Sequence, residues 1–169
     1  MQALGLSWGA VAPAPHYAET HILRAAPVHR GARLLLDSWR ARQSQGRFVV
    51  GRDVPSRDLA KVLSGLALYE PLYTGDFRVR LAGHSLRRRF GRDVTGENLS
   101  RLMDEAQFTR HAAQMKALLE TGAPLIVEVR LHEEGRLRLC YELVALRVFA
   151  PDGVTPWVLG GIFFHDWRL

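Results

Sequence analysis

The sequence predicts an α+β domain in which helices cover one antiparallel sheet. Alternating apolar and polar residues predict two strands near the middle of the chain and three more near its end. Helical segments precede and separate these two groups instead of following each strand in turn, which argues against a parallel βαβ sheet. The predicted fold is therefore a five-stranded antiparallel sheet with helices on one face and an N-terminal helix flanking it.

The chain is expected to fold as one domain preceded by a flexible segment. Its 169 residues are typical of a single domain. Residues 1–28 contain repeated Gly and Pro and lack the pattern of a signal peptide, so we expect a flexible lead-in, with the domain itself over 29–169. No apolar run approaches the roughly 20 residues that a membrane helix requires. A single cysteine, Cys140, indicates no disulfide scaffold, and a cytoplasmic protein is expected.

The helices are predicted from apolar positions three and four residues apart. The first is expected over 29–43, where such a stripe faces charged residues. Shorter helices are predicted over 56–64, 84–90 and 96–103. The longest is expected over 105–120, because Asp104 and Gln107 have the spacing of a capping box just before its apolar stripe.

The strands are predicted over 66–70, 77–82, 125–132, 136–149 and 156–165. The first two are close enough in sequence to pair as a hairpin. The apolar positions of 136–149 change phase midway, which predicts a bulge or a bend. Gly160 and Gly161 interrupt a last strand that is apolar on both faces, which indicates either a central strand close to something large or a strand with a kink.

Two motifs carry a resemblance to a known family. Residues 75–83 read Gly-Asp-Phe-Arg-Val-Arg-Leu-Ala-Gly, and the turn Phe90-Gly-Arg-Asp-Val-Thr-Gly96 follows. With the order of strands and helices over about residues 30–167, they resemble the PAS domain, and in particular a bacterial family of small stand-alone PAS-like proteins. The resemblance implies a sensory or protein-interaction module in cytoplasmic signalling, whose signal passes to a separate protein.

The resemblance also implies a pocket between the sheet and the middle helices, which in PAS domains holds haem, flavin or a small metabolite, or is filled by side chains. The cofactor, if there is one, stays unknown. Seven residues expected between helices and sheet are the candidates for lining it: Phe90, Met103, Phe108, His111, Met115, Tyr141 and Phe163. Met and aromatic side chains line adaptable cavities, but they fill packed cores equally well, and both interpretations stay open.

An enzyme is the alternative function, and we predict no catalytic residue. Glu142 lies inside a strand, where a buried carboxylate would have a raised pKa and would suit acid–base chemistry in an apolar pocket. A cross-strand salt bridge with Arg130 or Arg138 explains the same residue equally well. The sequence contains no glycine-rich phosphate loop and no recognisable nucleophile motif, so no enzymatic activity is expected.

Charge and histidine spacing argue against two other classes, nucleic-acid-binding proteins and metalloproteins. The net charge is +6, and 21 of the 23 basic residues are Arg, but they are scattered, so nucleic-acid binding is not expected. The only basic run is Arg87-Arg88-Arg89, which is either a solvated helix face or a site for an anionic ligand. The seven histidines show no local spacing of metal ligands, and no metal site is predicted.

A homodimer is predicted from the last two strands, which are apolar on both faces. Such a sheet needs a cover on its second face. The candidate cover is the 29–43 helix, through Leu35, Leu36 and Trp39, supplied either by the same chain or by a second copy.

Overall fold

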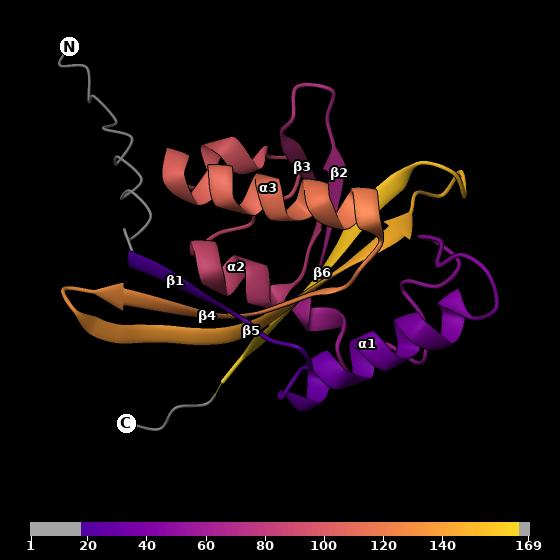
Figure 1. Cartoon of the computed structure of the whole chain (residues 1–169), viewed down its shortest axis with the longest axis horizontal. Helices are drawn as coiled ribbons and strands as arrows, with labels where there is room; N and C mark the ends of the chain where they lie inside the picture. Colours follow the sequence, from indigo (N-terminus) through magenta and orange to yellow (C-terminus); the bar gives the residue numbers. More distant parts are fainter. Residues whose placement is uncertain (1–17, 166–169) are drawn as a thin grey trace, which may run out of the picture.

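The computed structural model describes residues 18–165, which form six strands and three α-helices around one antiparallel sheet (Figure 1). The strands follow one another across the sheet in the order β1-β4-β5-β6-β2-β3. Their bounds are β1 Ala18–Leu23, β2 Leu66–Pro71, β3 Phe77–Ala82, β4 Leu125–Glu133, β5 Arg136–Phe149 and β6 Pro156–Phe164. The α-helices are α1 Arg30–Gln43, α2 His84–Phe90 and α3 Glu105–Thr121, and two short 3-10 helices are η1 Leu63–Gly65 and η2 Leu99–Arg101. The predicted α+β class is confirmed.

The sheet separates two layers of helices. Figure 1 shows α2 and α3 on one side of it and α1 on the other. Each layer has its own apolar cluster: one joins α2, η2 and α3 to the sheet, and the other joins α1 and the 48–63 segment to the opposite face. The strands at the centre of the sheet are therefore buried on both faces, which explains their continuous apolar character.

The sheet has one strand more than the sequence predicted. Residues 18–23 form β1, which pairs antiparallel with β4 along one edge. The prediction of a flexible lead-in over 1–28 is therefore wrong from Ala18 onward, and its residues 1–17 lie outside the described part of the chain. The strand was missed because two of its inward-facing residues, Glu19 and His21, are polar.

Two of the predicted short helices are tight turns instead. In place of 56–64, successive i→i+3 hydrogen bonds lead into η1, among them Val62 N–H to Leu59 C=O at 2.9 Å. In place of 96–103, only η2 forms, with Leu102 N–H donating to Leu99 C=O at 3.0 Å. The apolar positions are buried as expected, but segments this short bury them with 3-10 geometry.

The other elements match their predictions closely. The hairpin of β2 and β3 forms, and Asp104 and Gln107 make both hydrogen bonds of the capping box that begins α3. The β4–β5 register shifts at Arg138, which has no partner on β4. This irregularity lies several residues before the change of phase that the sequence predicted in β5. That change of phase has a different cause: Tyr141 and Ala145 belong to the cluster under α2 and α3, whereas Val144 and Leu146 belong to the cluster under α1.

The predicted dimer contacts are internal. Leu35 and Leu36 are completely buried against the sheet, and the Trp39 indole Nε1–H donates to the Arg147 carbonyl at 2.9 Å. The helix thus covers the second face of its own sheet, and these three residues are not available to a second copy. Glu142 fixes the start of this helix, because its carboxylate accepts the Val28 and His29 N–H groups at 2.9 and 3.1 Å.

Candidate ligand cavity and its polar wall

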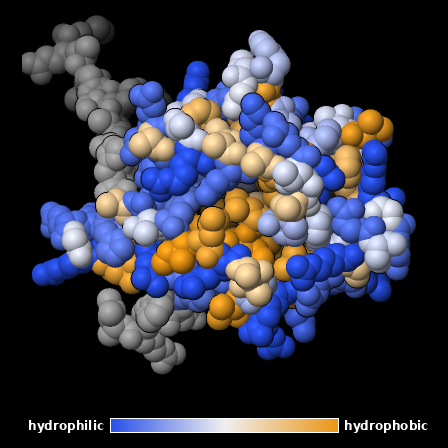
Figure 2. Space-filling view, in the orientation of Figure 1, coloured by the Kyte–Doolittle hydropathy of each residue, from blue (hydrophilic) through white to orange (hydrophobic). Residues whose placement is uncertain are grey.

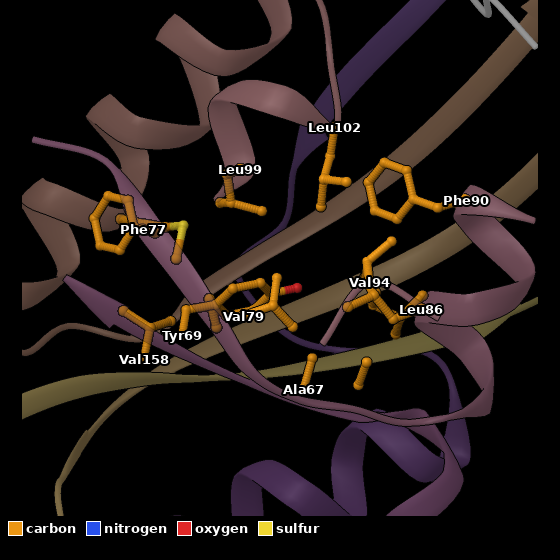
Figure 3. Packing of buried hydrophobic residues seen from close by; sticks show 14 of the residues in the cluster. Ala67, Tyr69, Phe77, Val79, Leu86, Phe90, Val94, Leu99, Leu102 and Val158 are labelled. Carbon is orange, nitrogen blue, oxygen red and sulfur yellow. The ribbon is translucent and has the colours of Figure 1, made fainter. Parts of the chain in front are cut away.

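A cavity of about 60 Å³ lies between the sheet and the layer of α2, η2 and α3. Most of its wall is apolar: Leu86, Leu99, Leu125, Leu143, Val158 and Ile162 contribute to it. Figure 3 shows Leu86 and Phe90 of α2, together with Leu99, approaching Tyr69 of β2 from the helical side. In the view of Figure 1, Figure 2 shows hydrophobic surface near the middle of the molecule, below α3. A single water needs roughly 10–15 Å³ of such space, so the cavity has room for a group of a few non-hydrogen atoms.

The structure places five of the seven predicted pocket residues on the cavity wall. These are Phe90, Met103, His111, Met115 and Tyr141. Phe108 packs against the same apolar cluster without lining the cavity. The prediction for Phe163 is wrong: neighbouring residues of a strand face opposite ways, so Ile162 lines the cavity and Phe163 points toward α1. There Phe163 stacks on the His29 ring, with 5.2 Å between centroids.

One part of the wall is polar and was not predicted as a unit. Arg89, His111 and Gln114 come together there from α2 and α3. Arg89 is almost fully buried, and its Nη2 lies 3.5 Å from Glu19 Oε2 on β1. No sequence pattern joins Arg89 to the other two residues, because α2 and α3 become neighbours only in the folded chain.

Two tyrosines add hydroxyl groups to this wall. Burial raises the pKa of Tyr141 to about 12; the nearby Glu19 carboxylate acts in the same direction, and the charge and hydrogen bond of Arg89 oppose it. Burial also raises the pKa of Tyr69. Both hydroxyls are therefore protonated at neutral pH. Within residues 18–165, the Tyr69 hydroxyl has no hydrogen-bond partner, which leaves it available to a molecule in the cavity.

Beside this wall, Glu19 ties β1 to α3. Its Oε1 lies 2.9 Å from His111 Nε2 and also contacts His21 Nε2, and the two imidazole rings meet edge to face with centroids 4.9 Å apart. Although burial by itself would raise the pKa of Glu19, the hydrogen bonds and charges of the two histidines hold that pKa well below its ordinary value of 4.5. The carboxylate is consequently ionised across the physiological range.

The arginine run does not form one anion site. Arg87 pairs with Asp93 at 3.1 Å on the surface, and Arg88 lies over the Phe164 ring, 4.2 Å from its centroid. Only Arg89 reaches the cavity wall. Successive residues of a helix point about 100° apart, so three neighbours cannot share one small ligand.

Comparison with known proteins agrees with this architecture. A family model described as PAS domain matches residues 28–163. A comparison with curated proteins gave no match. In the part of the chain that the structure describes, no helix is both long and apolar enough to span a membrane. A sheet with a helical layer over a small cavity, and a family match over most of the chain, lead to one identification: the chain belongs to the PAS domain family, whose members are in general sensory or interaction modules.

Proposed function

We propose that this PAS domain is a cytoplasmic sensor that binds a small molecule in the cavity and passes its occupancy to a separate signalling protein. The observation that carries the proposal is the cavity itself, because it combines an apolar wall with a few convergent polar groups. That combination is characteristic of small-molecule sites in proteins.

The lining restricts the chemistry of the ligand. The apolar wall suits a short hydrocarbon body, and the cavity volume of about 60 Å³ limits the buried part to a few non-hydrogen atoms. The Tyr69 hydroxyl and the amide of Gln114 favour a polar end that takes part in hydrogen bonds. Arg89 is already paired with Glu19, so a full negative charge on the ligand is not required.

The cavity wall also offers a route by which occupancy alters the surface. Residues of α2, η2 and α3 all line the cavity, and the outer sides of these elements face solvent. A ligand that fits only one spacing between these elements and the sheet shifts the population toward that spacing. A partner protein that contacts their outer sides would respond to that shift.

Glu142, the residue considered for an enzymatic function, does not face the cavity. Glu142 points away from the cavity toward the start of α1, where its carboxylate accepts two backbone N–H groups. The observed contacts of Glu142 therefore match neither of its two predicted roles, an acid–base group in the pocket or a salt bridge with Arg130 or Arg138. The structure thus favours a binding function for the cavity over acid–base chemistry at Glu142.

Native mass spectrometry of freshly purified protein, compared with its denatured mass, tests the proposal. We expect extra mass that is lost on denaturation. In addition, straight-chain alcohols and carboxylates of increasing length should produce saturable shifts of amide NMR signals in α2 and α3. A bare native mass together with no saturable shift for any of these probes would exclude the small-molecule site.

A cavity-filling substitution makes the test specific. Ala145 lies on the cavity wall in β5, so Ala145→Leu should occupy the space and abolish the probe-induced shifts. The matched control is Ala41→Leu on the exposed side of α1, which should leave the shifts unchanged. Equal probe binding in both variants would place the ligand elsewhere.

A further inference from the structure

Three side chains with metal-ligating atoms converge beside the polar wall of the cavity. Glu19 and His21 are two residues apart on β1, so both point to the same face of the sheet. His111, which is 92 residues away from Glu19 in the sequence, reaches them from α3. One ligand atom of each, a carboxylate oxygen and two imidazole nitrogens, lies within 4.8 Å of the others.

We propose that Glu19, His21 and His111 form a binding site for one Zn²⁺-class divalent ion. Two imidazoles and one carboxylate are a donor set that first-row transition ions accept, with a further coordination position left open. His111 also lines the cavity, so the cluster lies beside the cavity wall. The metal ion would be a different ligand from the small molecule of the proposed function, and its binding would not require that molecule.

The cluster is built as a buried unit. The side chains of Glu19, His21 and His111 are only 2%, 8% and 15% exposed. Both histidines direct Nε2 at the same carboxylate oxygen, Oε1 of Glu19. The two Nε2 atoms and Oε1 therefore face one point. A metal ion at that point, with bond lengths of roughly 2.0–2.2 Å, would replace the protons that these atoms share.

Neighbouring groups orient the three ligands. The Gln114 amide lies 3.4 Å from Nδ1 of His21, the ring nitrogen that does not face the carboxylate. Arg89 Nη2 lies 3.5 Å from the second carboxylate oxygen of Glu19. Outer contacts of this type fix the ring orientation and the free oxygen of metal ligands.

The donor atoms select among ions. The cluster has one carboxylate, that of Glu19, and its other two ligand atoms are imidazole nitrogens. Mg²⁺ and Ca²⁺ require several oxygen ligands, which these residues do not provide. Imidazole nitrogens favour Zn²⁺ and Co²⁺ instead.

The test uses the full chain, without an affinity tag and stripped of metal by a chelator. Co²⁺ is the probe, because its visible absorption changes when the hydrated ion enters a four- or five-coordinate protein site, and Zn²⁺ is then added in competition. We expect one equivalent of Co²⁺ to give a saturable visible band that Zn²⁺ removes and Mg²⁺ does not.

Variants show whether the band belongs to this cluster. His111→Gln and Glu19→Gln should abolish it, whereas His84→Gln, a substitution at an exposed histidine of α2, should retain it. Gln114→Leu should weaken binding about 10- to 100-fold, because Gln114 orients His21. If Glu19→Gln fails to fold, the titrations of His111→Gln and of the wild-type protein still show whether the band belongs to this cluster.

Absence of a saturable band in the wild-type protein would overturn the proposal, and so would an unchanged band in His111→Gln. Either result would leave the cluster as a hydrogen-bonded tie between β1 and α3. Neither result would affect the expected alcohol and carboxylate shifts, so the two proposals fail separately.

Discussion

At the scale of single residues, Glu142 shows how a buried charge is used for structure. The side chain is 1% exposed, and its two oxygens accept the N–H groups of Val28 and His29, which precede the first turn of α1. A carboxylate at this end of a helix also interacts favourably with the helix dipole. The residue thus connects the sheet to the helix that covers it.

Removal of this carboxylate should destabilise the domain. We expect Glu142→Ala to lower the free energy of unfolding by about 2 kcal/mol, because the two N–H groups lose a charged acceptor. Glu142→Gln keeps one acceptor oxygen and should lose about half as much. Urea denaturation measures both, with Glu120→Ala on the exposed side of α3 as control. A loss in Glu142→Ala no larger than in the control would contradict this role.

Glu19 predicts how stability depends on pH. Its folded pKa is held below 4.5 against the effect of burial, so the unfolded chain binds a proton at a higher pH than the folded chain does. The stability that this difference contributes is fully present above 4.5 and is lost as the pH falls below it. The free energy of unfolding should therefore decrease more steeply below about pH 5 in the wild type than in Glu19→Gln.

Denaturation with urea at several pH values measures this difference. Glu120→Gln serves as control, since Glu120 is exposed, and should follow the wild-type curve. Parallel curves for Glu19→Gln and the wild type would show that Glu19 does not have a depressed pKa in the folded protein.

At the scale of elements, the close approach of α1 to β6 depends on Gly161. A Cβ at this position would lie 2.5 Å from Leu35 Cδ2 and 2.6 Å from Phe163 Cε2. Its neighbour Gly160 faces the cavity side, where a Cβ would lie 3.0 Å from the Tyr69 ring. The two glycines therefore form a matched pair with different surroundings.

We expect Gly161→Ala to lower the free energy of unfolding by about 2 kcal/mol, because two buried side chains must move. Gly160→Ala should change it by less than about 1 kcal/mol, because the Tyr69 ring has cavity space beside it and alanine restricts the unfolded chain. Thermal and urea unfolding of both variants measure the difference. Equal losses would mean that α1 does not approach β6 as closely as described.

The elements also show what the sequence could predict. Local signals were sufficient for the hairpin of β2 and β3 and for the start of α3, because turns and capping boxes are made by residues close in sequence. The edge strand β1 was missed, because its inward-facing Glu19 and His21 contradict the apolar alternation of a strand.

In the candidate site, too, local patterns predicted some residues and missed the contacts between distant elements. Phe90, Met103 and Met115 were predicted as pocket residues because apolar periodicity marks the inner face of an element. The polar wall and the cluster around Glu19 depend on contacts between β1, α2 and α3, and no local pattern specifies these contacts. The sequence therefore indicated most of the apolar part of the site and single polar members such as His111, and the fold showed how the polar residues are grouped.

At the scale of the whole molecule, the two faces of the sheet are packed in different ways. The layer of α2, η2 and α3 encloses a cavity, whereas the layer of α1 is filled by leucine, valine and aromatic side chains. A sheet covered on both faces by its own chain does not need a second copy for burial. The apolar character of β5 and β6, which suggested a homodimer, is thus explained within one chain.

Trp39 distinguishes a helix that covers its own sheet from a helix that forms a dimer contact. The residue is 7% exposed, packs in the α1 cluster and donates its indole N–H to the Arg147 carbonyl. Trp39→Ala should lower the free energy of unfolding by about 3–5 kcal/mol, and Trp39→Phe, which keeps most of the packing, by less. Sedimentation should give the same mass for Trp39→Phe as for the wild type. If α1 instead covered the sheet of a second copy, Trp39→Ala would halve the mass and leave a folded monomer, because the lost contacts would lie between chains.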